Sequence, residues 1–178
     1  MLYVYVNKLK RSNNLQKRIF RTGIGQDSHK FFSEKTSKPC VLGGVVFEDS
    51  IGMEANSDGD VVYHAICNAI SSVTTVPILG GIAHELFVKD GITDSEVYLK
   101  EAIRTLKNKK ISHVAISIEA KRPRFQNKIN DMRKQIAKVM DLKEDQIGIT
   151  ATSGDGLTNV GLGEGITCFC TISVCEDQ

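Results

Sequence analysis

The sequence predicts one α/β domain of the α+β type, a two-layer sandwich with a mixed β-sheet and helices packed on one face. Apolar segments with strand-like alternation take turns along the chain with segments of helical periodicity. The chain has 178 residues, which is long enough for one domain with its own core. Its composition, 41% hydrophobic and 25% charged, is ordinary for a globular protein.

The strands are predicted from short runs rich in β-branched and apolar residues. They are expected at 20–24, 40–47, 111–120, 146–152 and 165–176. A polar loop over 32–39 separates the first two strands. We expect a flexible stretch around Pro77, Gly80 and Gly81, because proline and glycine favour turns over regular structure.

The helices are predicted from capping residues followed by apolar side chains at helical spacing. Asn, Ser and Asp side chains accept hydrogen bonds from free amide groups, so the segment 56–60, NSDGD, predicts a helix start directly after it. The segment 93–96, TDSE, predicts a second helix to about Lys107. A third is expected from about Asn127 to Met140, with Ile129 and Ile136 on its apolar face.

Charge and cysteine content limit the classes of partner and compartment. A net charge of +2 argues against nucleic acid or an anionic membrane as the main partner. No apolar run approaches the roughly 20 residues of a membrane-spanning helix. The five cysteines form no CxxC pair, which argues against a disulfide framework or a cysteine zinc site. We therefore expect a reducing, cytoplasmic compartment.

The N-terminal segment is basic, with six Lys or Arg and no acidic residue in residues 1–26. A processed targeting peptide has this composition. However, the run MLYVYV is too short for the apolar region of a signal peptide, and its alternation suits a strand. We expect an ordered N-terminal extension over 1–20, followed by a single domain over 21–178.

A first candidate site is the pair Asp27 and His29. Side chains two residues apart on an extended backbone point to the same side. A catalytic Zn²⁺ ion takes imidazole nitrogen and carboxylate oxygen from three protein ligands and keeps one position open. The pair supplies two such ligands; the alternative interpretation is a capped turn or a hydrogen-bonded surface pair.

His64 is the candidate for a third ligand, because it lies on the apolar helix that follows 56–60. The alternative is a core or surface histidine with one hydrogen bond. Asp60 lies four residues earlier on the same helical face, either orienting His64 or occupying the first turn. His84 and His113 have no comparable pairing in the sequence and are interpreted as structural.

Two loops are candidates for phosphate binding. Residues 151–166, ATSGDGLTNVGLGEGI, place Thr152, Ser153 and Gly154 after a strand, where hydroxyl and backbone N–H groups can surround a phosphate. Asp155 offers oxygen to a hard cation such as Mg²⁺. The alternative is a glycine-rich turn between strands. Residues 119–125, EAKRPRF, are a basic run that either faces phosphates or is a solvated loop.

Taken together these motifs resemble the 2-C-methyl-D-erythritol 2,4-cyclodiphosphate synthase family, over about residues 21–174. GIGQDSHKF resembles the opening motif of that family, and NSDGDVVYHA resembles its H-S-D-G-D-x-x-x-H-A helix start, with His64 at a metal-ligand position. AKRPRF and ATSGDG…VGLGEGI resemble two further family loops. The resemblance implies a lyase of non-mevalonate isoprenoid biosynthesis, a homotrimer with active sites between subunits.

The implied reaction is closure of 4-diphosphocytidyl-2-C-methyl-D-erythritol 2-phosphate to the cyclic diphosphate with release of CMP. Asp27, His29 and His64 would hold Zn²⁺ or another divalent transition metal, and Asp155 a second ion, Mg²⁺ or Mn²⁺. Asn56 and Ser153 would be catalytic. The residues implied to contact substrate are Asp27, Ser28, His29, Asn56, Ser57, Gly81, Ile82, Ala83, Ala120, Lys121, Arg122, Pro123, Arg124, Phe125, Gln126, Thr152, Ser153, Gly154, Asp155, Asn159 and Leu162.

The sequence departs from the family pattern in the residues that hold substrate. Asn56 stands where the family has a histidine, and Gly81 where it has an aspartate. Asp155 and Arg124 replace a glutamate and a lysine, Gly156 a lysine, and Leu162 an arginine. Two rival functions are a metal-dependent phosphohydrolase and a non-catalytic protein that binds a nucleotide or an isoprenoid phosphate on the same fold.

Overall fold

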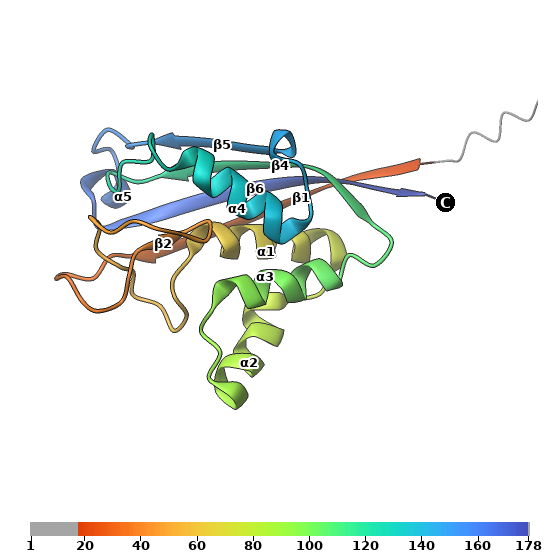
Figure 1. Ribbon diagram of the computed structural model, residues 1–178, viewed down its shortest axis with the longest axis horizontal. Helices are drawn as coiled ribbons and strands as arrows, with labels where there is room; N and C mark the ends of the chain where they lie inside the picture. Colours follow the sequence, from red (N-terminus) through yellow and green to blue (C-terminus); the bar gives the residue numbers. More distant parts are fainter. Residues whose placement is uncertain (1–17, 178) are drawn as a thin grey trace, which may run out of the picture.

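The structure, a computed structural model, describes residues 18–177. One layer is a four-stranded sheet in the order β1-β6-β4-β5 (Figure 1). β6 is antiparallel to both neighbours, whereas β4 and β5 are parallel, so the sheet is mixed. The strands are β1 Arg18–Lys30, β4 Lys110–Glu119, β5 Ile147–Thr152 and β6 Gly165–Asp177.

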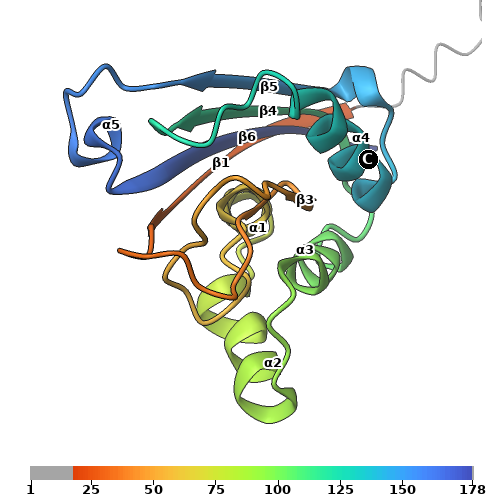
Figure 2. The same cartoon turned by 60° about the vertical axis from the view of Figure 1, so that its left-hand side comes forward.

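The second layer is helical and lies on one face of this sheet. Figures 1 and 2 show α1, α3 and α4 on the same side, with α2 farthest from the strands. The helices are α1 Val61–Thr74, a π-helical turn Ile78–Ile82, α2 Ala83–Asp90, α3 Ser95–Arg104, α4 Ile129–Met140, a 3₁₀ turn Glu144–Gln146 and α5 Asn159–Leu162. The predicted two-layer sandwich with a mixed sheet is confirmed.

α1 packs closely on β1 at two glycines. A Cβ atom at Gly23 would lie 2.3 Å from the carbonyl oxygen of Ala69, and one at Gly25 would lie 2.1 Å from that of Ala65. Both distances are far below van der Waals contact, so only glycine admits the helix backbone here. The close approach puts the first turn of α1 beside the second half of β1.

The N-terminus of α1 is held by the buried carboxylate of Asp60. It accepts hydrogen bonds from the amides of Val62 and Tyr63 and, across the chain, from those of Gly43 and Gly44 at 2.9 and 2.7 Å. Burial raises the pKa of Asp60 to about 6, against the lowering effect of these N–H groups. Asp60 is therefore the N-cap predicted from the NSDGD segment, and it anchors a second loop as well.

Several element boundaries differ from the predictions. The first strand extends to Lys30, so Asp27 and His29 lie within β1 rather than after its end. The predicted strand 40–47 is a hairpin of β2 Val41–Leu42 and β3 Val45–Val46, because Gly43 and Gly44 adopt φ of 59° and 74° and turn the chain.

The stretch predicted to be flexible is helical from Ile78 to Asp90. Pro77 immediately precedes this helical segment, where its missing amide hydrogen is not needed, and Gly91 ends it with a φ of 65°. Of the predicted N-terminal extension, residues 18–20 belong to β1, and residues 1–17 lie outside the described part. The boundary between an extension and a domain stays a prediction.

Within residues 18–177 no single helix is long and apolar enough to cross a membrane. α1 and Ile78–Asp90 meet the length and composition criteria only as a pair bent by 110°.

Candidate metal centre and substrate cavity

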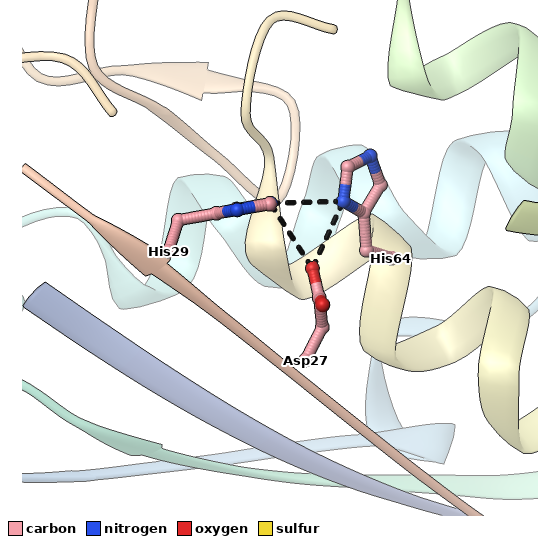
Figure 3. Close-up of side chains that lie close together, drawn as sticks. All are labelled: Asp27, His29 and His64. Atoms are coloured by element: carbon pink, nitrogen blue, oxygen red, sulfur yellow. Dashed lines mark hydrogen bonds and ion pairs between the residues drawn. The ribbon is translucent and has the colours of Figure 1, made fainter. Parts of the chain in front are cut away.

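Asp27, His29 and His64 converge where α1 crosses β1 (Figure 3). An Asp27 carboxylate oxygen lies 2.9 Å from His64 Nδ1 and 3.1 Å from His29 Nε2, and the two nitrogens are 3.1 Å apart. Asp27 and His29 share the helix-facing side of β1 because they are two residues apart. His64 reaches them from the first turn of α1.

The donor set fits a divalent transition metal. Ligand atoms at about 2.0–2.1 Å from a tetrahedral Zn²⁺ ion lie about 3.3 Å from one another, close to the separations of these three atoms. The carboxylate of Asp27 is ready to bind, because burial, which raises its pKa, is outweighed by its hydrogen bonds to His29 and His64, and the net pKa is well below the ordinary value. The predicted set of three ligands is therefore brought together by the fold.

The second ring nitrogen of His64 points away from this centre. Its Nε2 atom lies 2.9 Å from Ser95 Oγ and 3.3 Å from Ser57 Oγ. Asp60, for which the sequence allows a role in orienting His64, accepts hydrogen bonds from backbone amides instead. Ser95 Oγ in turn donates a hydrogen bond to the carboxylate of Asp58, so the Ser95 hydroxyl links His64 to Asp58.

A cavity of about 390 Å³ opens beside the metal centre. Its lining includes the predicted residues Asp27, His29, Asn56, Ser57, His64 and Ala83. Gly81 and Ile82, which precede Ala83, do not line this cavity. Sequence reasoning missed the other lining residues, which are Glu54, Ala55, Leu79, His84, Phe87 and Tyr98.

His84, which the sequence analysis interprets as structural, is exposed and lies on the cavity wall. It stands three residues before Phe87 on α2, and residues at this spacing share a helical face. The signal available in the sequence was this spacing together with Gly91 as a helix stop. It was overlooked because Gly80 and Gly81 suggested a turn.

The two predicted phosphate loops lie together but away from this cavity. The backbone of Ala120 donates to the carbonyl of Thr152 at 3.0 Å, which joins the loops at the ends of β4 and β5. Thr152, Ser153 and Asp155 are exposed, and Ser153 Oγ donates to an Asp155 carboxylate oxygen at 2.9 Å. Among the described residues, the group suited to a metal comprises Asp27, His29 and His64, without Asp155.

The basic loop 120–126 is tied to the loop before β6. Arg122 donates to the carbonyl of Gly163 at 3.2 Å and lies 5.1 Å from the ring centre of Phe31. Arg124 and Gln126 are exposed, whereas Phe125 is buried against Phe47. Arg122, Pro123 and Arg124 line a separate cavity of about 520 Å³.

A third, shallow cavity of about 240 Å³ lies on the other side of His29. Its lining includes the predicted residues Ser28 and Asn159. Leu162 is 57% exposed nearby on α5. Within one chain the predicted substrate residues thus form separate groups. One group lines the cavity beside the metal centre, a second lines the shallow cavity on the other side of His29, and a third lies on the loops that follow β4 and β5.

Comparison with known proteins is consistent with this geometry. The model of the YgbB family matches residues 20–175. The 2-C-methyl-D-erythritol 2,4-cyclodiphosphate synthase of Chlamydia caviae is 59% identical over 159 residues, covering 89% of this chain and 90% of the relative. The synthase of Chlamydia felis is 58% identical over the same length, with the same coverage.

Solved structures show the same fold. The structure titled IspF (Plasmodium falciparum) CDP complex matches with a TM-score of 0.76 and 28% identity, covering 89% of this chain and 97% of that one. The bifunctional IspDF from Campylobacter jejuni matches with a TM-score of 0.81 and 26% identity, over 90% of this chain and 43% of that longer one. The chain therefore belongs to the YgbB family, the family of the 2-C-methyl-D-erythritol 2,4-cyclodiphosphate synthases.

Proposed function

We propose that the protein converts 4-diphosphocytidyl-2-C-methyl-D-erythritol 2-phosphate to 2-C-methyl-D-erythritol 2,4-cyclodiphosphate and CMP, in non-mevalonate isoprenoid biosynthesis. The observation that carries the proposal is the convergence of Asp27, His29 and His64 beside a cavity, in a chain of this family. An oxygen of the 2-phosphate forms a bond to the β-phosphorus. The bond from that phosphorus to the bridging oxygen breaks, and its electron pair leaves with CMP.

The contribution of the chain is mainly to hold the reacting groups in line. The attacking phosphate is already an anion, so the step needs little proton transfer. Asp27, His29 and His64 hold the first metal ion, Zn²⁺ or another divalent transition metal. When bound, it supplies positive charge that polarises a phosphate oxygen. Asn56, exposed on the cavity wall, donates its side-chain amide to the reacting phosphate.

The loops at the ends of β4 and β5 hold the nucleotide end of the substrate. Thr152 and Ser153 offer exposed hydroxyls to phosphate. Asp155 holds the second cation, Mg²⁺ or Mn²⁺, because its exposed carboxylate offers the oxygen ligands that hard ions prefer. The 120–126 loop surrounds the cytosine, and its backbone groups supply the hydrogen bonds. A related protein has been solved as a CDP complex, which supports a cytidine diphosphate-linked substrate for this fold.

We infer that the active molecule is a homotrimer, with each site between two subunits. The face of the sheet opposite the helices carries Phe20, Ile24 and Phe169, which are 72%, 62% and 48% exposed in one chain. Packing of three copies through this face removes the apolar surface from water. It also offers a way for the β4–β5 loops of one subunit to reach the metal centre of the next.

The expected location is the cytoplasm, without a nucleic-acid or membrane partner. All five cysteines are free thiols, as expected in a reducing compartment. The net charge of +2 supplies no strong field for polyanions.

The test is incubation of the purified protein with the diphosphocytidyl substrate, with and without a chelator, followed by ³¹P NMR of the products. We expect CMP and the cyclic diphosphate, and loss of both when the metal is removed. Linear phosphate products would indicate the phosphohydrolase instead, since water would then be the nucleophile. Binding of the substrate without any turnover would indicate the non-catalytic alternative. That alternative is suggested by Gly81 and Gly156, which stand where the family has charged residues.

A further inference from the structure

We infer that Ser95 is a positioning residue for the metal centre. Together with Asp58 it fixes the orientation and the tautomer of His64, so that Nδ1 presents a lone pair to the metal ion. The inference rests on the proposed metal site. It adds two residues, neither of which belongs to the predicted ligand or substrate set.

The two nitrogens of the His64 ring face different partners. Nδ1 lies 2.9 Å from the Asp27 carboxylate, on the side of the metal centre. Nε2 lies 2.9 Å from Ser95 Oγ, on the side of α3. A neutral imidazole carries its proton on only one nitrogen, and a metal ligand must leave the binding nitrogen bare.

The direction of the hydrogen bond at Nε2 follows from Asp58. An ionised carboxylate only accepts hydrogen bonds, and Asp58 Oδ1 lies 2.5 Å from Ser95 Oγ. Ser95 therefore donates its hydroxyl proton in a hydrogen bond to Asp58. Its oxygen can then only accept from His64, which requires the imidazole proton to be on Nε2 and leaves Nδ1 free.

Asp58 is itself held in place by hydrogen bonds to the backbone, so the acceptor for the Ser95 hydroxyl has a fixed position. Its Oδ1 accepts from the amide of Asp60 at 3.0 Å, and its Oδ2 accepts from the amide of Ser95 at 3.2 Å. Its own amide donates to the carbonyl of Thr93 at 2.8 Å. These bonds join the loop before α1 to the start of α3, and they fix both residues relative to His64.

Burial distinguishes this serine from an ordinary residue in the first turn of a helix. Ser95 is 0% exposed and His64 is 6% exposed, so water competes little for the hydrogen bond between them. Ser57 offers a second oxygen to Nε2, but at 3.3 Å, and that oxygen already accepts from the amide of Gly59. Ser95 is therefore the main partner of Nε2.

The test measures zinc affinity of the purified full chain by competition with a chromophoric chelator. Ser95→Ala removes the acceptor for Nε2–H, and we expect affinity to fall about 10–100-fold, the range known for outer-shell partners of metal-bound histidines. Ser95→Thr keeps the hydroxyl and should therefore lose much less affinity than Ser95→Ala. Ser71→Ala is the matched control, because Ser71 Oγ is buried without a hydrogen-bond partner among the described residues.

A second readout is the tautomer of His64 in the zinc-free protein, followed by ¹⁵N NMR of labelled histidine. The wild type should carry the proton on Nε2. In Ser95→Ala the proton should move toward Nδ1, where the Asp27 carboxylate accepts it. Asp58→Asn should shift the tautomer in the same direction, because the amide nitrogen of asparagine can donate to Ser95 Oγ and release the hydroxyl proton toward Nε2.

Two results would overturn the inference: an unchanged tautomer in Ser95→Ala, or zinc affinity within twofold of the wild type in that variant. Equal loss of affinity in Ser95→Thr and Ser95→Ala, at unchanged urea midpoints, would also contradict it, since the hydroxyl would then not matter. Failure of the wild type to bind zinc would instead contradict the metal centre itself. The tautomer would still decide the role of Ser95, because it is measured without metal.

Discussion

The Nδ1 atom of His64 lies 2.9 Å from a carboxylate oxygen of Asp27, although the two residues are 37 positions apart in the sequence. The contact depends on the packing of α1 against β1 at glycine positions. At Gly25 a Cβ atom would lie 2.1 Å from one backbone atom of α1 and 2.2 Å from another. The metal centre is therefore built by a helix–strand approach that only glycine permits.

Gly25→Ala should separate α1 from β1 and weaken the metal centre. We expect the free energy of unfolding to fall by about 1–3 kcal/mol or more, because the obstructing atoms belong to backbone and cannot rotate away. Urea denaturation and zinc content after dialysis measure the two effects. Gly80→Ala is the control, since a Cβ there meets nothing within 4 Å. Similar behaviour of both variants would contradict this account of the packing.

Asp60→Asn should destabilise the protein without directly changing a metal ligand. Both carboxylate oxygens of Asp60 accept hydrogen bonds from backbone amides. In asparagine one of these oxygens is replaced by an NH2 group, which would face a backbone N–H donor. We expect a loss of about 1–3 kcal/mol in the free energy of unfolding. Asp94→Asn, at the N-cap of α3, should cost far less, because asparagine caps helices as well as aspartate does. Equal losses would argue against the anchoring role of Asp60.

The buried thiols should make the protein less stable in alkali. Burial raises the pKa of Cys40 to about 11 and that of Cys170 to about 12, from 9.0. In the unfolded chain these thiols ionise near pH 9, whereas in the folded chain they stay protonated, so stability falls as the pH rises above about 9.

At pH 10 the expected loss relative to pH 8 is on the order of 1 kcal/mol for each such thiol. Urea denaturation at the two pH values measures it. Cys170→Ala should show a correspondingly smaller difference between the two values. A difference as large as that of the wild type would show that Cys170 does not contribute to the alkaline loss.

Phe169→Lys should dissociate the proposed trimer. Phe169 lies on the open face of β6, and a charge there would be repeated in each copy around the interface. Sedimentation velocity should show a monomer, and CMP release should fall with it. Val88→Lys, at an exposed apolar position on α2, should leave the mass unchanged. A monomeric wild type, or a trimeric Phe169→Lys variant, would contradict the trimer.

Local patterns in the sequence predicted most of the fold. The capping segment 56–60 located the start of α1, and alternation located β4, β5 and β6. Prediction from local patterns failed where short-range signals in the sequence conflicted with the packing of the folded chain. Pro77, Gly80 and Gly81 indicate a turn in isolation, but the chain is helical there and supplies part of the cavity wall. Similarly, the apolar run 40–47 conceals the turn at Gly43 and Gly44.

The three residues of the candidate metal centre were predictable because each lies in a short motif with its own spacing. Ser95 and Asp58 were visible in the sequence only as helix-capping residues. The contacts of Ser95 with His64 and with Asp58 depend on where α3 packs against α1, which no local pattern states. His84 was missed for the same reason, since its place on the cavity follows from the position of α2.

The most direct test of the account compares His64→Ala with His113→Ala, whose histidine is exposed on β4 away from the metal centre. Zinc content and CMP release from the diphosphocytidyl substrate are measured on the same preparations. We expect His64→Ala to lose both together and His113→Ala to keep both. Undiminished CMP release from a zinc-free His64→Ala protein would contradict the proposed role of the metal centre.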